Sequence, residues 1–223
     1  MVRFGKFVLA AVAIAILSLG NTVNAGVIYD NTSVTPQNYD EAIVDGPLFD
    51  SFSTGGTALS LTDVKLNLAT TNGSSNKSFT VSLVNDNGSN KPGTTKALLG
   101  TIADNTLSTG GSTKDVSSFS PIGLDANTRY WIEVNANSVS SVEWGISPDS
   151  SGTGVAGEYW AYNPGGTLVV TQNAPSGSAN TPFQMQVTAS AVSSVPEPST
   201  LSLALSALGI CVVGIARRRA IRS

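Results

Sequence analysis

Four acidic side chains are the residues best suited to acid–base chemistry, namely Glu133, Glu143, Asp149 and Glu158. Two carboxyl groups that face each other across a cleft can hydrolyse a glycosidic bond. Glu133 and Glu143 each lie near a tryptophan in a stretch of alternating apolar and polar residues, and the alternative is that both face solvent from strands. The chain has no histidine, which excludes Ser-His-Asp and Cys-His triads and histidine-based metal sites.

Two other routes to catalysis have little support. Ser74-Ser75-Asn76-Lys77 has the S-x-x-K spacing of a Ser-Lys dyad, but it lies in a run of Gly, Asn and Ser that is typical of a turn. The single cysteine, Cys211, stands in an apolar run near the C-terminus, where it serves as a small apolar residue. We therefore predict that the protein is not an enzyme, and a glycan-active enzyme with paired carboxylates is the catalytic alternative.

A turn-rich stretch carries a candidate calcium site. Asp86, Asn87 and Asn90 place oxygen atoms around Gly88, as calcium-binding loops do. The stretch lacks the further acids and the closing glutamate of an EF-hand, and Asn-Gly is also a strong hairpin signal. We predict a hairpin turn here and no cofactor, with calcium at these three residues as the alternative.

Three aromatic residues are candidates for sugar binding. The stretch Tyr159-Trp160-Ala161-Tyr162 alternates, so a strand here turns Trp160 and Tyr162 toward the same face. Neighbouring rings suit stacking on the apolar face of a sugar ring. Trp131 is the other candidate, because it lies opposite the apolar face that starts with Tyr130. Burial in the core is the alternative for each ring.

The elements that position these residues are predicted to be strands. Short alternating stretches are separated by turn residues, and no long stretch has an apolar period of 3.6 residues. The expected strands cover residues 26–29, 48–53, 59–68, 79–83, 98–102, 116–119, 130–134, 142–146, 159–162, 168–170 and 183–187, with a phase slip near Thr62-Asp63. Roughly ten strands at this length predict an all-β fold, an antiparallel β-sandwich with jelly-roll or Greek-key connections.

Part of this region also resembles a known group of domains. The stretches Phe79–Leu83, Lys91-Pro92-Gly93 with the following Leu98-Leu99, and Leu124–Ile132 resemble the choice-of-anchor domains, particularly type R. The resemblance spans roughly residues 27–188. Those domains occur with different surface-anchoring tails, so the resemblance implies this fold and a location at the cell surface, and it implies no catalytic activity.

The N-terminus is predicted to be a secretory signal peptide over residues 1–25. Arg3 and Lys6 precede an apolar stretch over 7–19, and small residues before the Ala25–Gly26 bond make that bond the expected cleavage site. Signal peptidase and the secretion machinery are the partners that this segment implies. The outer domain is then expected to span residues 26–194, enough for one domain with a core of its own.

The C-terminal residues 195–223 form a tail of three parts. Val195-Pro196-Glu197-Pro198 is extended and accessible because its prolines fix the backbone. Residues 200–216 are uncharged, and as a transmembrane helix they would span roughly 26 Å, the short end of what crosses a bilayer. Arg217-Arg218-Arg219 would then stay on the cytoplasmic side.

This order of motif, apolar run and basic stop resembles the PEP-CTERM sorting signal of Gram-negative bacteria that make exopolysaccharide. The resemblance implies that an integral-membrane transpeptidase, exosortase, recognises Pro196, Glu197 and Pro198 and processes the tail. The protein would be anchored transiently in the inner membrane and would then reach the cell surface or the extracellular matrix. An ordinary C-terminal membrane anchor is the alternative.

The charge of the outer domain excludes one class of partner. Residues 26–195 carry six basic and fourteen acidic side chains, a net charge of −8, and a surface this acidic repels nucleic acid. The sequence therefore favours an exported, non-catalytic surface or matrix protein that is sorted by exosortase and associated with exopolysaccharide. A carbohydrate-binding module that uses exposed aromatic residues is the second reading.

Overall fold

The described part of the chain is almost entirely β. The computed structural model describes residues 25–116, 119–136, 139–173 and 181–192. The strands of this part are β1 (Ala25–Asp30), β2 (Asn38–Glu41), β3 (Leu48–Ser53), β4 (Leu59–Thr70), β5 (Ser78–Asp86), β6 (Pro92–Ala103), β7 (Ser112–Asp115), β8 (Ile122–Leu124), β9 (Arg129–Ala136), β10 (Val142–Ile146), β11 (Tyr159–Tyr162), β12 (Val169–Gln172) and β13 (Met185–Ala191). Short 3-10 turns lie at η1 (Asp104–Thr106) and η2 (Pro164–Gly166).

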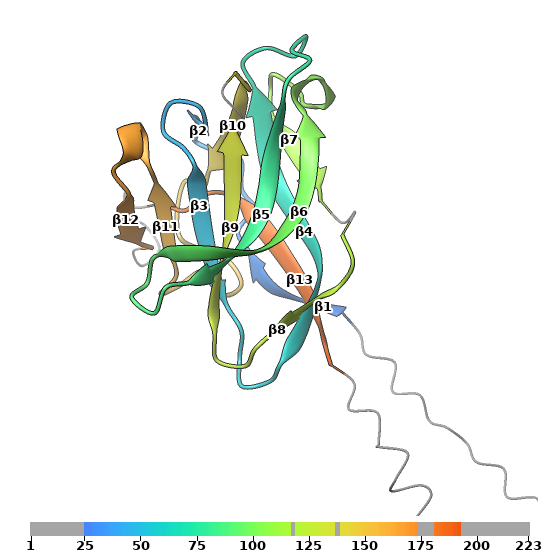
Figure 1. The fold of residues 1–223 in the computed structure, drawn as a ribbon, viewed down its shortest axis with the longest axis vertical. Helices are drawn as coiled ribbons and strands as arrows, with labels where there is room; N and C mark the ends of the chain where they lie inside the picture. The colour runs from blue at the N-terminus through green and yellow to red at the C-terminus, as the bar shows by residue number, and fades with distance from the viewer. Residues whose placement is uncertain (1–24, 117–118, 137–138, 174–180, 193–223) are drawn as a thin grey trace, which may run out of the picture.

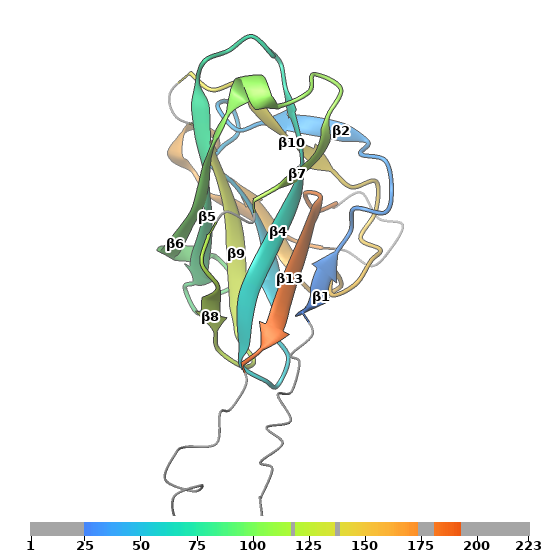
Figure 2. The ribbon, with the colours of Figure 1, turned by 90° about the vertical axis from the view of Figure 1, so that its right-hand side faces the viewer.

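These strands form two antiparallel sheets that face each other (Figures 1 and 2). Within the described residues, the first sheet has the order β1-β13-β4-β10-β2, with β7 and β8 also paired to β4. The second sheet has the order β12-β11-β3-β9-β5-β6. The prediction of an all-β fold with two packed antiparallel sheets is confirmed. The structure adds the short strands β2, β7 and β8, which the alternation alone did not define.

The longest strand of the first sheet contains the predicted phase slip. Along β4, Asp63 pairs with Thr188 and Leu61 pairs with Ala189, so Thr62 is an extra residue and forms a β-bulge. The bulge lets Leu61 and Val64 both face the core, where neither has exposed surface. An uninterrupted strand would place these two residues on opposite faces.

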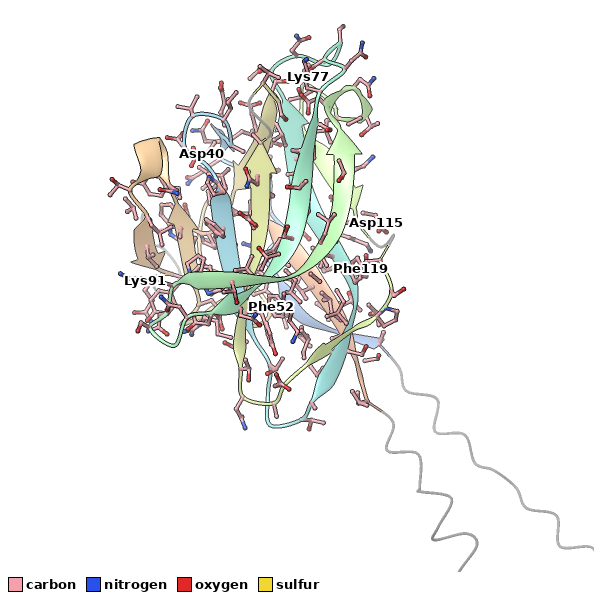
Figure 3. The ribbon with its side chains drawn as sticks, viewed as in Figure 1. Asp40, Phe52, Lys77, Lys91, Asp115 and Phe119 are labelled. Carbon is pink, nitrogen blue, oxygen red and sulfur yellow. The ribbon has the colours of Figure 1, made fainter. Side chains whose placement is uncertain are left out.

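The core lies between the two sheets and follows the predicted alternation. Its fully buried members include Leu66 and Leu68 from β4, and Tyr130, Ile132 and Val134 from β9. Phe79, Val81 and Leu83 of β5 and Trp144 of β10 are also fully buried in it. Phe52 likewise points inward from β3 (Figure 3). Inward-facing apolar positions from both sheets therefore make one continuous core.

The β5–β6 hairpin covers part of the outer face of the second sheet. Three register irregularities interrupt the pairing of β5 with β6, and such bulges bend a ribbon. The hairpin crosses in front of β9 and β3, and Lys91 marks its tip (Figures 1 and 3). Beneath it lies a small second cluster of buried apolar residues, namely Phe49, Val84, Trp131 and Ala161.

Several predicted segments lie outside the described residues. These are the signal peptide up to residue 24, the motif at 195–198, the apolar run over 200–216 and the basic stop at 217–219. Ala25 and Gly26, at the predicted cleavage site, are the first residues of β1. Within the described ranges, the structure has no helix whose length and apolar character would suit a membrane span.

Candidate functional site

Trp131 is removed from the sugar-binding candidates by its burial. It lies on the outer face of β9, as its place in the alternation predicts, but the ring has no exposed surface. Its indole N–H donates a 3.0 Å hydrogen bond to the Asp86 carboxylate on the covering hairpin. The ring therefore fixes the hairpin to the sheet and offers no face to a sugar.

Trp160 and Tyr162 lie side by side on β11 and are both half-buried. Their ring centroids are 5.6 Å apart with planes inclined by 16°, so the two rings stack on each other. The Trp160 ring also makes an edge-to-face contact with Phe183, with the two ring centroids 5.8 Å apart. The predicted alternation is correct, with Ala161 buried on the other face. These two rings stay candidates, although they pack partly against the main core.

Two of the four candidate acids, Glu133 and Glu143, lie on opposite outer faces of the sandwich. Glu133 lies on the outer face of the second sheet, and burial raises the pKa of its carboxyl. Glu143 lies on the outer face of the first sheet, where burial and then the charge of Glu41 raise its pKa. These two acids are separated by the whole sandwich, so they cannot flank one glycosidic bond.

The other two acids are bound to neighbouring donors. Asp149 is half-buried and accepts a 2.8 Å hydrogen bond from the Ser151 amide. Glu158 is almost fully buried, and one oxygen accepts hydrogen bonds from the Ser51 hydroxyl at 2.6 Å and from Arg129 Nε at 2.8 Å. Arg129 also lies over the Tyr159 ring, with its guanidinium carbon 4.7 Å from the centroid. Glu158 thus belongs to a structural ion pair beneath the hairpin.

The candidate calcium residues form the hairpin turn. Asp86 accepts a 2.7 Å hydrogen bond from the Gly88 amide, and Asn87 accepts a 2.9 Å bond from the Ser89 amide. The side-chain oxygen of Asn90 accepts from the Arg129 guanidinium, whose positive charge opposes a cation at that oxygen. Among the described residues, no group of three or more acidic side chains comes together as a metal site would require.

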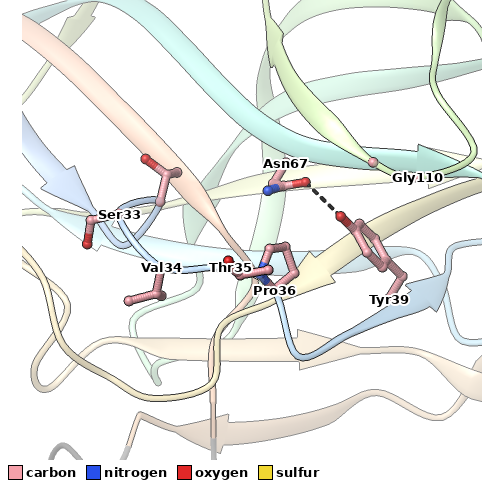
Figure 4. Close-up of a pocket in the computed structure, with 9 residues that line it drawn as sticks. Ser33, Val34, Thr35, Pro36, Tyr39, Asn67 and Gly110 are labelled. Carbon is pink, nitrogen blue, oxygen red and sulfur yellow. Dashed lines mark hydrogen bonds between the residues drawn. The ribbon is translucent and has the colours of Figure 1, made fainter.

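The structure also contains a groove that no sequence pattern indicates. It has a volume of about 570 Å³ and lies on the outer face of the first sheet. Its walls are the β1–β2 connection on one side and the loop that precedes β7 on the other (Figure 4). The lining residues are Thr32, Ser33, Val34, Thr35, Pro36, Tyr39, Asn67, Gly110 and Gly111.

Two buried amide side chains hold the β1–β2 connection in place. Asn31 has no exposed surface, donates to the Phe183 carbonyl at 2.8 Å and accepts from the Met185 amide at 2.8 Å. Gln184 is also fully buried and donates to the Val34 carbonyl at 2.8 Å. Because these donors and acceptors are withdrawn from water, the groove wall is fixed before any ligand arrives.

A hydrogen-bonded chain crosses the floor of the groove. The Tyr39 hydroxyl donates to the Asn67 side-chain oxygen at 3.1 Å (Figure 4). The Asn67 amide donates in turn to the Gln184 side-chain oxygen at 2.9 Å. Burial and then the charge of Glu143 raise the pKa of the Tyr39 hydroxyl, which therefore stays protonated at neutral pH. The chain orients both side chains.

Two glycines make room for the Tyr39 ring. A Cβ atom at Gly145 would lie 3.2 Å from the ring, and one at Gly111, whose φ is +74°, would overlap the Tyr39 hydroxyl.

The lining of the groove consists of one aromatic ring, one proline ring, one valine, hydroxyl groups, an amide and two glycines, with no charged lining residue. Such a set can bind and orient a polar, uncharged ligand, but it contains no nucleophile with an adjacent base.

The family comparison concerns the C-terminal end of the chain. Residues 194–220 match the family model described as the PEP-CTERM protein-sorting motif. The predicted sorting signal is confirmed. This motif supports an exported protein that exosortase processes at the membrane. A search of curated proteins finds no match to the chain.

The sorting motif begins close to the end of the last strand. β13 ends at Ala191, and the matched segment starts at residue 194. β1 and β13 pair antiparallel with Ala25 opposite Ser190, so the beginning of β1 and the end of β13 lie side by side at one end of the sandwich (Figure 1). The sorting motif therefore follows the folded domain directly.

Proposed function

We propose that this chain is an exported, non-catalytic surface or matrix protein, which exosortase sorts and which acts beside exopolysaccharide in a Gram-negative bacterium. The observation that carries the proposal is the PEP-CTERM motif over residues 194–220. The two-sheet fold and the resemblance of the outer domain to choice-of-anchor domains support a surface location.

The connection between domain and motif supports processing close to the membrane. Five residues lead from Ala191 to Pro196, and a fully extended chain of that length reaches at most about 18 Å. Before processing, an anchored tail would hold one end of the sandwich, where β1 begins and β13 ends, near the membrane surface. The loops at the opposite end would then point away from the membrane, toward polysaccharide outside the cell.

Two observations support a non-catalytic role. The chain has no histidine, and Glu133 and Glu143 lie on opposite outer faces of the sandwich. Asp50, which is fully buried, and Glu158, which is paired with Arg129, are also poorly placed to meet a substrate.

The test is the intact mass of the protein recovered from its native cells, with cell-associated and released fractions kept separate. We expect a mass that begins at Gly26 and ends between Val195 and Ser199, with or without an added group. Pro196→Ala and Glu197→Ala should retain the complete tail and stay cell-associated, whereas the control Pro148→Ala, at an exposed loop proline, should be processed normally. Normal processing of both motif variants, or a wild-type mass that runs through Ser223, would overturn the proposal.

A second candidate function is sugar binding by the half-buried pair on β11. The stacked rings of Trp160 and Tyr162 favour it. In that case tryptophan fluorescence should change on addition of a glycan and the change should be lost in Trp160→Ala. An unchanged response in that variant would exclude this pair as the sugar site.

A further inference from the structure

We infer that the groove between the β1–β2 connection and residues 110–111 is a binding site for an uncharged saccharide. The inference rests on the proposed function, since it names the class of polysaccharide that the outer domain would meet and the place where it would bind. It concerns a different part of the molecule from Trp131, Trp160 and Tyr162, because the groove lies on the outer face of the first sheet.

The size and rigidity of the groove suit a small part of a glycan chain. Its volume of about 570 Å³ lies within the range of roughly 300–1,000 Å³ that is typical of small-molecule sites. The walls are held by the buried side chains of Asn31 and Gln184, and the floor is held by the hydrogen bond between Tyr39 and Asn67. A site that is ordered before binding loses little conformational entropy when a ligand arrives.

The chemistry of the lining matches the surface of a sugar ring. Tyr39 and Pro36 supply apolar ring surface, which suits the C–H face of a pyranose. Thr32, Ser33 and Thr35 supply hydroxyl groups that can both donate and accept hydrogen bonds. Val34 is the one aliphatic side chain in the lining, so an apolar ligand or peptide side chain would find little matching surface.

The surrounding charge selects against acidic saccharides. None of the lining residues is charged, but Glu41 and Glu143 are cross-strand partners on the same outer face as Tyr39. Their mutual repulsion contributes to the raised pKa of Glu143, and the charge of Glu143 contributes to that of Tyr39. This negative field disfavours uronic acids and sulfated sugars at the groove, and a neutral saccharide escapes that penalty.

Gly110 offers a way to block the groove without disturbing the fold. A Cβ atom there would have its nearest neighbour, the Ser108 hydroxyl, at 3.8 Å, an ordinary contact distance. Gly110→Trp should therefore fold and fill the groove with its side chain. Gly123→Trp is the matched control, because Gly123 is exposed on β8 and no atom lies within 4 Å of its Cβ position. Tyr39→Ala is the second variant, since it removes the ring from the floor.

The experiment measures binding by the full-length protein in mild detergent with isothermal titration calorimetry. The probes are cellohexaose, maltohexaose and mannohexaose, with hexagalacturonate as the acidic counterpart, and the unfolding temperature of each variant is recorded. We expect at least one neutral probe to bind at least tenfold more tightly than hexagalacturonate. Gly110→Trp and Tyr39→Ala should each weaken that binding at least tenfold, while Gly123→Trp keeps wild-type affinity.

Three results would overturn the inference. They are no binding of any neutral probe, preferential binding of hexagalacturonate, and wild-type affinity in a folded Gly110→Trp variant. Loss of binding in Trp160→Ala alone would place the sugar site on β11 instead. The proposed function fails by a different result, normal tail processing in the Pro196→Ala and Glu197→Ala variants, so the two failures are distinguishable.

Discussion

The Arg129–Glu158 ion pair is predicted to be a main support of the covering hairpin. Arg129 is 20% exposed and Glu158 is 6% exposed at the side chain, and the nitrogen–oxygen distance is 2.8 Å. Arg129→Met leaves the buried carboxylate of Glu158 without its counter-ion. Breaking a buried pair on one side costs about 3–5 kcal/mol, and the partial exposure of Arg129 places the expected loss near the lower end, about 3 kcal/mol.

The assay is urea unfolding of the full-length protein at pH 7, followed by tryptophan fluorescence. The free energy of unfolding from this assay should fall by about 3 kcal/mol, and in a parallel thermal unfolding experiment the same loss lowers the unfolding temperature of a domain of this size by roughly 6–12 °C. The control is Lys96→Met, which removes an exposed cation 5.5 Å from the Tyr130 ring centroid and should cost several times less. The double variant Arg129→Met/Glu158→Gln isolates the charge, because glutamine keeps a partner for the Ser51 hydroxyl.

The double variant should therefore regain more than half of the stability that Arg129→Met loses, because no unpaired charge remains buried. A loss below about 1 kcal/mol in Arg129→Met would refute the reasoning, as would a double variant less stable than the single one. Either result would mean that the ion pair contributes little and that apolar packing around Phe49, Val84 and Trp131 holds the hairpin.

Two further predictions concern other buried groups. Burial, and then the charge of Glu158, raise the pKa of Asp50 well above its usual value, so the folded protein binds this proton more tightly than the unfolded chain. The free energy of unfolding should then fall as the pH rises from about 4 through the folded-state pKa of Asp50. Asp50→Asn should remove that fall and be the more stable protein at pH 8, which urea unfolding at a series of pH values can measure. Parallel curves of stability against pH for the two proteins would contradict this. Asp86→Ala leaves the Trp131 indole N–H without its hydrogen-bond acceptor at 3.0 Å, which should lower the free energy of unfolding by about 1–2 kcal/mol. The tryptophan emission should shift to the red in this variant, whereas the control Asn87→Ala should leave the emission unchanged. Equal spectra in the two variants would show that the hairpin stays closed without Asp86.

The long strands and their faces could be predicted from the sequence because alternation with a period of two is a local property, whereas the short strands β2, β7 and β8 could not, and the strand expected over 116–119 is not formed at Val116 or Phe119. The inward faces of β4, β5 and β9 and the bulge at Thr62 all follow from the order of apolar and polar residues. The sorting tail could be predicted for a related reason, since its motif, apolar run and arginines are contiguous and act as a linear segment.

Only the tertiary structure decided what lies above each face. The sequence placed Trp131 correctly on the outer face of its strand, but alternation does not specify the bulges in the β5–β6 pairing or the face over which the bent hairpin lies. The separation of Glu133 from Glu143 likewise depends on which sheet each strand joins. The groove is the clearest case, because Tyr39, Asn67 and Gly110 come from three separate segments, and each looks alone like an ordinary strand or turn residue. A period of two tells which residues share a face, but long-range pairing determines which segments cover that face and which leave it open.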